Sequence, residues 1–145
     1  MPDIELSEIN LSAKCDHRGF ILRAEEGYRC FISELGERIA SDERVRIVLL
    51  AGPSGSGKTT SANLLADNLR GRGLSSFVIS LDNFYRDRGD EAYPRLDDGS
   101  YDFESVDALN LSELEKTLRD IIDGRDFEVP RYDFKLGGRS KRMRY

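Results

Sequence analysis

A glycine-rich run, GPSGSGKTT, occupies residues 52–60 and matches the pattern G-x-x-x-x-G-K-[ST] at every fixed position. Its glycines let the backbone wrap so that successive N–H groups point inward at phosphate oxygens. Lys58 can then reach the β- and γ-phosphates of a nucleotide, and the Thr59 hydroxyl can coordinate Mg²⁺. The residues expected to hold the phosphates are Gly52, Pro53, Ser54, Gly55, Ser56, Gly57, Lys58, Thr59 and Thr60.

A second stretch with chemical potential is LDNFYRD, residues 81–87, in which Asp82 follows an apolar run. A carboxylate at this point could cap a helix, close a turn, bind Mg²⁺ or accept the proton of a hydroxyl group. Phe84 and Tyr85 come directly afterwards, and the Tyr85 hydroxyl gives that ring a polar group. The residues alone leave these roles for Asp82 open.

Two apolar segments are predicted to position these groups. Residues 46–51 (RIVLLA) are apolar on both faces, as a central parallel strand requires, and residues 76–81 read as a second buried strand. Between them lies a helical pattern that stops at Gly71 and Gly73. This order predicts a right-handed βαβ unit. Because ligands gather at the carboxyl ends of parallel strands, we expect the glycine-rich loop and Asp82 to face one crevice.

The segment before the first predicted strand divides into two parts. Residues 1–19 are mostly polar and are interpreted as a loose arm or an edge strand, whereas residues 20–40 repeat apolar side chains at helical spacing. Gly27 and Gly36 weaken this helix without excluding it.

The second half of the chain begins with a long loop, residues 85–101, which is rich in charges and turn formers. A helix is predicted to start at Asn110, with Glu113 completing a capping box, and to end at Gly124. Residues 127–129 are predicted to form a short strand.

These elements predict an α/β fold, a P-loop NTPase-type parallel sheet flanked by helices with an N-terminal helical segment. We divide the chain into an arm and amphipathic helix at 1–44 and a P-loop domain at 45–145. The composition, with 39% hydrophobic and 34% charged residues, is that of a folded water-soluble domain.

Composition also bears on location and partners. No apolar run approaches the roughly 18 residues of a membrane span, and the polar N-terminus is not a secretory signal. Cys15 and Cys30 are therefore expected to be free, buried or half-buried thiols in the cytoplasm, and His17 alone has no metal-site spacing. We expect no membrane partner.

The net charge of −5 argues against a nucleic-acid partner, although the charge is uneven. The C-terminal end carries basic residues and no acid: Lys135, Arg139, Lys141, Arg142 and Arg144. Such an end could meet phosphates or remain a solvated tail.

Four motifs, GPSGSGKTT, SLDNFYRD, YDFESVDAL (101–109) and VPRYDF (129–134), occur in the order seen in the uridine kinase and phosphoribulokinase family. The chain resembles that family over residues 45–139, and most of all a bacterial uridine-kinase-like branch. The resemblance implies a kinase that uses ATP and Mg²⁺ to phosphorylate the 5′-hydroxyl of a nucleoside or a similar small acceptor. Asp82 would be its catalytic base and, with Thr59, a metal ligand, and Lys58 would assist catalysis.

The resemblance also implies acceptor-binding residues. Glu104 falls where nucleoside kinases of the group have an Asp that holds the ribose hydroxyls, Tyr132 falls in the nucleobase pocket, and Tyr85 borders that pocket. Arg139, in the closing YDFKLGGR motif, is a further substrate residue. One position departs from the family: uridine–cytidine kinases have a histidine where this chain has Gly137, which argues against uridine itself.

The chain ends at Tyr145, whereas members of the group continue with a further strand and an arginine-bearing lid. The resemblance thus implies the N-terminal part of a longer enzyme or a shortened protein that binds nucleotide without turnover. The basic run 139–144 could replace the lid arginine. An incomplete parallel core would expose apolar surface and favour a homo-oligomer. The alternatives to a kinase are a P-loop hydrolase or switch and a non-catalytic ATP-binding fragment.

Overall fold

The computed structural model describes residues 5–53 and 55–145. These residues contain both helices and strands and divide into two compact units. Unit 1 comprises the residues up to Val45 together with Leu49–Phe77, and unit 2 comprises Arg46–Val48 and Val78–Tyr145. The two units are described separately below.

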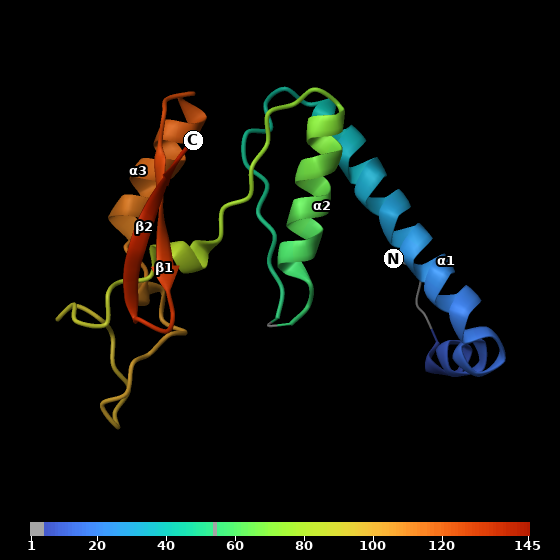
Figure 1. The fold of residues 1–145 in the computed structure, drawn as a ribbon, viewed down its shortest axis with the longest axis horizontal. Helices are drawn as coiled ribbons and strands as arrows, with labels where there is room; N and C mark the ends of the chain where they lie inside the picture. The colour runs from blue at the N-terminus through green and yellow to red at the C-terminus, as the bar shows by residue number, and fades with distance from the viewer. Residues whose placement is uncertain (1–4, 54) are drawn as a thin grey trace. The chain divides into compact units, whose positions relative to one another are not determined.

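Unit 1 consists of two helices, α1 (Leu6–Ala40) and α2 (Lys58–Gly71), and the C-terminal half of α1 lies beside α2 (Figure 1). Gly36 of α1 permits this approach, since a Cβ atom there would lie 2.1 Å from Asn68 Oδ1. The glycine that weakens the helix locally thus leaves room for the Asn68 side chain of α2.

Helix α1 is longer than the sequence predicts. The helix expected at 20–40 is present, but residues 6–19 are also helical. The prediction of a loose arm or an edge strand was therefore wrong for residues 6–19. A kink at Asp16 (φ −154°, ψ 69°) separates the two parts. There the Asp16 carboxylate accepts a hydrogen bond from the Gly19 N–H at 2.9 Å and begins a new helical segment. Residues 1–4 of the predicted arm lie outside the described residues.

The predicted parallel strands are not formed by the described residues. Residues 46–51 and 76–80 belong to neither helix nor strand, and Leu81 begins the 3₁₀ turn η1 (Leu81–Phe84). A strand exists only where a neighbour bonds its N–H and C=O groups. Neither segment has such a neighbour among residues 5–53 and 55–145, and Leu49 is 84% exposed.

Unit 2 is built around an antiparallel hairpin of β1 (Glu128–Asp133) and β2 (Gly138–Arg144), which lies beside α3 (Leu111–Ile122) (Figure 1). The predicted strand at 127–129 therefore continues through Pro130, which a two-stranded sheet tolerates because each strand is an edge. The core comprises Phe84, Phe127 and Val129, covered by Ile79, Leu109, Leu114 and Ile121.

The helix boundaries with the clearest local signals are confirmed. Helix α3 is capped by Asn110, whose Oδ1 accepts the Glu113 N–H at 3.2 Å, and it stops before Gly124 at φ +67°. Helix α2 begins at Lys58, within the glycine-rich run, and ends at Gly71, where the sequence predicts its end. A second 3₁₀ turn, η2 (Val106–Ala108), precedes α3.

Cys15 and Cys30 are free, as predicted, but both are exposed, so the expectation that they are buried or half-buried was wrong. Among the helices that the structure describes, none combines the length and the apolar character of a membrane span. No group of three or more His, Cys, Asp or Glu side chains that could hold a metal ion occurs within the described ranges.

Candidate functional site

The glycine-rich loop of unit 1 has the backbone that its sequence requires. Gly55 and Gly57 adopt left-handed conformations, at φ +74° and +81°, and a Cβ atom at either would meet nothing within 4 Å. Both therefore serve the path of the chain rather than close packing. The Lys58 ammonium lies across the loop, with Nζ 2.7 Å from the Pro53 carbonyl oxygen. Ser54, also predicted to hold phosphate, lies outside the described residues.

Helix α2 presents its N-terminus at the end of this loop. Its first N–H groups have no acceptor within the helix, and the helix dipole gives this end partial positive charge. Thr59 and Thr60, in the first turn, are exposed. The loop amides, the Lys58 ammonium and the Thr59 hydroxyl together form a donor set suited to phosphate oxygens and a hard cation.

Asp82 lies in the first turn of η1 in unit 2, but it does not cap that turn. The Asp82 N–H donates to Ser80 Oγ at 3.3 Å, so Ser80 is the capping residue. The Asp82 carboxylate is exposed and makes no hydrogen bond or ion pair with another described residue. The capping role considered for Asp82 is thus excluded, and its carboxylate is available for chemistry.

Tyr85 and Tyr132, far apart in the sequence, lie together in unit 2. Their ring centroids are 5.7 Å apart, and the Tyr85 hydroxyl donates to the Phe103 carbonyl oxygen at 3.1 Å. Further edge-to-face and tilted contacts extend the pair. We call the resulting group the aromatic cluster: Tyr85, Tyr93, Tyr101, Phe103, Tyr132 and Phe134.

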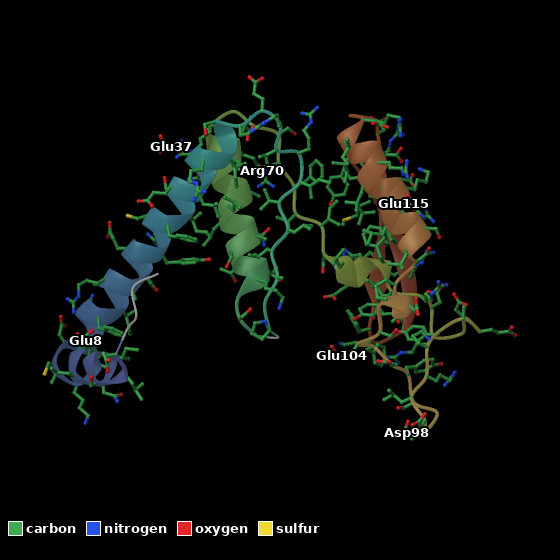
Figure 2. The ribbon with its side chains drawn as sticks, turned by 180° about the vertical axis from the view of Figure 1, so that it is seen from behind. Glu8, Glu37, Arg70, Asp98, Glu104 and Glu115 are labelled. Atoms are coloured by element: carbon green, nitrogen blue, oxygen red, sulfur yellow. The ribbon has the colours of Figure 1, made fainter. Side chains whose placement is uncertain are left out.

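The electrostatics place both predicted carboxylates near this cluster. Burial raises the pKa of Tyr85, and the negative charges of Asp82 and Glu104 raise it further. Glu104 is exposed; Figure 2 shows Asp98 at the tip of the loop and Glu104 nearer to the helices of the same unit. Unit 2 therefore brings together four of the sequence-predicted residues: Asp82, Tyr85, Glu104 and Tyr132.

Sequence reasoning missed part of this site. The hydroxyls of Tyr93 and Tyr132 and the Arg88 Nε are buried, and none has a hydrogen-bond partner among the described residues. A buried polar atom left in this state costs about 1–3 kcal/mol, so each calls for a functional explanation. The available signal was the concentration of aromatic residues at 93, 101 and 103 in an otherwise polar loop.

Comparison with known proteins identifies the family to which the chain is similar. The sequence model of the Phosphoribulokinase / Uridine kinase family matches residues 47–144. The chain belongs to this family.

Several curated relatives are named uridine kinase or uridine-cytidine kinase. The chain is 39% identical over 92 residues to a uridine kinase of Schizosaccharomyces pombe, covering 63% of this chain and 20% of the relative. It is 38% identical over 93 residues to uridine-cytidine kinase B of Dictyostelium discoideum (64% and 37%), and 34% identical over 95 residues to a uridine kinase of Staphylococcus epidermidis (66% and 44%). The chain thus spans less than half the length of these relatives. No solved structure matches it significantly.

In this member of the kinase family, the backbone and the side chain of Arg88 lie against Gly137. The Arg88 N–H donates to the Gly137 carbonyl oxygen at 2.9 Å, and a Cβ atom on Gly137 would lie 2.5 Å from Arg88 Cδ. Gly137 also has φ +66°, in the left-handed region. The Arg88 guanidinium carbon lies 5.6 Å from the centroid of the Phe103 ring. A positively charged side chain therefore joins the aromatic cluster at this position.

The predicted substrate residue Arg139 has a partner outside the cluster. Its Nη1 lies 2.6 Å from Glu113 Oε2 of α3, and Arg142 Nη2 lies 3.2 Å from the other oxygen of Glu113. Arg144 pairs with Asp126 at 2.7 Å. The basic end of this kinase-family chain is therefore strand β2 with ion-paired arginines, rather than a solvated tail.

Proposed function

We propose that the chain serves ATP-dependent phosphorylation of a small hydroxyl-bearing acceptor, in particular the 5′-hydroxyl of a nucleoside. Membership of the phosphoribulokinase / uridine kinase family supports this, as do relatives named uridine kinases. The observation that carries the proposal is the Tyr85–Tyr132 ring pair in unit 2, with Asp82 three residues before Tyr85 and Glu104 directly after Phe103, whose carbonyl oxygen accepts the Tyr85 hydroxyl. A P-loop hydrolase needs no such acceptor site.

In this proposal unit 1 holds the triphosphate. The amides of residues 52–60 and the Lys58 ammonium bind the phosphate oxygens, and the Thr59 hydroxyl is a ligand of Mg²⁺. When bound, Mg²⁺ would neutralise charge on the β- and γ-phosphate oxygens. A second role of Asp82 as a metal ligand is part of the same proposal. Ser54 is included on its sequence alone.

Unit 2 binds and activates the acceptor. The Asp82 carboxylate takes the proton of the acceptor hydroxyl, whose oxygen bonds to the γ-phosphorus as the bond to the bridging oxygen of ADP breaks. Glu104 accepts hydrogen bonds from the acceptor's other hydroxyls, and the rings of Tyr85 and Tyr132 flank its apolar face. Arg139 would contact the acceptor while it remains paired with Glu113.

The finer fold assignment is also a proposal. Family membership supports a P-loop NTPase-type domain at 45–145, preceded by residues 1–44 as a separate segment. The exposed apolar side chains at 48–50 support association with another chain or segment. A cytoplasmic location and the absence of nucleic-acid and membrane partners belong to this proposal.

The test is a transfer assay with γ-labelled ATP and a panel of nucleosides and sugars. We expect label on one class of acceptor, and Asp82→Asn should lower the rate by a factor of roughly 10²–10⁴ while nucleotide binding is retained. Asp107→Asn is the matched control, because Asp107 holds the same place in η2 that Asp82 holds in η1, with its N–H bonded to Ser105 Oγ. Hydrolysis that ignores the acceptor, or ATP binding without transfer, would overturn the kinase assignment.

A further inference from the structure

Helix α1 lies outside the residues that match the kinase family, yet it contacts the helix that follows the phosphate loop. In unit 1, Arg72 Nη2, at the C-terminal cap of α2, donates to the Ser33 carbonyl oxygen of α1 at 3.1 Å. Nearer to the loop, the Tyr28 hydroxyl donates to Ser61 Oγ at 2.5 Å. Helix α1 therefore contacts α2 at two points. One is remote from the glycine-rich loop, and the other is in the first turn of α2.

Ser61 connects the Tyr28 contact to the glycine-rich loop through hydrogen bonds. Its hydroxyl accepts from Tyr28 and donates to the Gly57 carbonyl oxygen at 3.0 Å, and its backbone N–H donates to the same oxygen at 2.9 Å. A serine hydroxyl has one proton to donate and two lone pairs, so both hydrogen bonds can form at once. Consecutive hydrogen bonds of this kind, from Tyr28 to Ser61 to Gly57, polarise and strengthen one another.

The Gly57 carbonyl and the Lys58 N–H belong to the same planar, trans peptide group. Holding the carbonyl in one direction therefore holds the N–H in the opposite one. Lys58 is the first residue of α2, so its N–H has no acceptor within the helix and is one of the amides proposed to bind phosphate. Gly57 itself, at φ +81°, has no side chain to restrict this peptide group.

We infer that Tyr28 is a positioning residue for the nucleotide: through Ser61 and Gly57 it orients the Lys58 amide, which makes α1 a functional part of the phosphate site. The inference rests on the proposed nucleotide binding. It assigns α1 a role that the family match does not, since the match begins at residue 47.

The test measures binding of MgATP to the full chain by titration calorimetry. Tyr28→Phe keeps the ring and removes the hydroxyl, and we expect it to weaken MgATP binding about three- to tenfold, the usual effect of one hydrogen bond. Ser61→Ala should weaken binding to a similar extent, and the double variant should show no further loss, because both changes break the same chain. In the transfer assay the KM for ATP should rise while the KM for the acceptor stays constant.

Ser33→Ala is the matched control, because it removes one hydroxyl of α1 at the Arg72 contact, away from the loop. It should leave MgATP affinity unchanged. Affinity of the Tyr28→Phe variant equal to that of the unchanged chain would overturn the inference alone, and so would an equal loss in Ser33→Ala. Failure of the unchanged chain to bind MgATP would instead overturn the proposed function, and with it this inference.

Discussion

The two units recognise their proposed ligands by different means. The loop of unit 1 is made of backbone amides, left-handed glycines and one lysine, and its residues are mostly exposed. The aromatic cluster of unit 2 is made of side chains, and Tyr93 and Tyr132 within it are buried. Phosphate is common to all nucleotides and suits a constant backbone motif, whereas an acceptor has individual groups that only side chains can distinguish.

The largest effect that should separate the units is on the stability of unit 2. Gly137→Ala forces a side chain into a left-handed conformation and against Arg88, and we expect a loss of about 2–4 kcal/mol in the free energy of unfolding. Gly99→Ala is the control, since Gly99 has φ +82° but nothing within 4 Å of its Cβ position. Denaturant titration should show the smaller loss for Gly99→Ala. Equal losses would mean that Arg88 does not confine Gly137.

A change in the loop should act on unit 1 alone. Lys58→Met keeps much of the side-chain length and removes the charge, and we expect MgATP affinity to fall roughly 10- to 100-fold through loss of a charge-assisted hydrogen bond. Lys14→Met, on the exposed part of α1, is the control. Both affinities can be measured by calorimetry, together with the denaturant midpoint of unit 2. A shift of that midpoint in Lys58→Met would contradict the separation of the two units.

The smallest effect concerns alkaline pH and again belongs to unit 2. Burial raises the pKa of Tyr93 from its usual 10 to about 12. A group whose pKa is raised on folding contributes stability below its unfolded pKa and loses it as pH rises, so unit 2 should lose about 1 kcal/mol by pH 11. Tyr93→Phe should remove this part of the pH dependence. A stability profile that is the same in both proteins between pH 9 and 11 would show that Tyr93 does not cause it.

The difference between the units also explains which features could be predicted from the sequence. The start of α2 and the Asn110 cap of α3 follow from local signals, because a cap or a glycine acts within one turn. The parallel strands predicted at 46–51 and 76–81 are not formed, because a strand depends on partners elsewhere and the pattern of one segment cannot supply them. The N-terminal part of α1 was predicted as an arm or an edge strand because residues 1–19 are mostly polar and show no clear helical stripe.

The residues of the candidate site also divide into those that a local motif specifies and those that depend on distant partners. The phosphate loop could be predicted residue by residue, because one continuous motif specifies it. Tyr85 was singled out for its hydroxyl and its place beside Asp82, Tyr132 was found only through resemblance to a family, and Tyr93 and Arg88 were missed. These residues meet through the path of a long loop between Tyr85 and Tyr101, and no spacing rule describes such a path.

The Ser80 cap has a consequence for turnover. Because the serine hydroxyl, and not the Asp82 carboxylate, satisfies the backbone of η1, the fold does not depend on the charge state of that aspartate. In its proposed role as the base, Asp82 would gain a proton and release it in every catalytic cycle. At this position it can do so without loosening the segment that carries it, and the neighbouring tyrosine would experience the change only as a change in local potential.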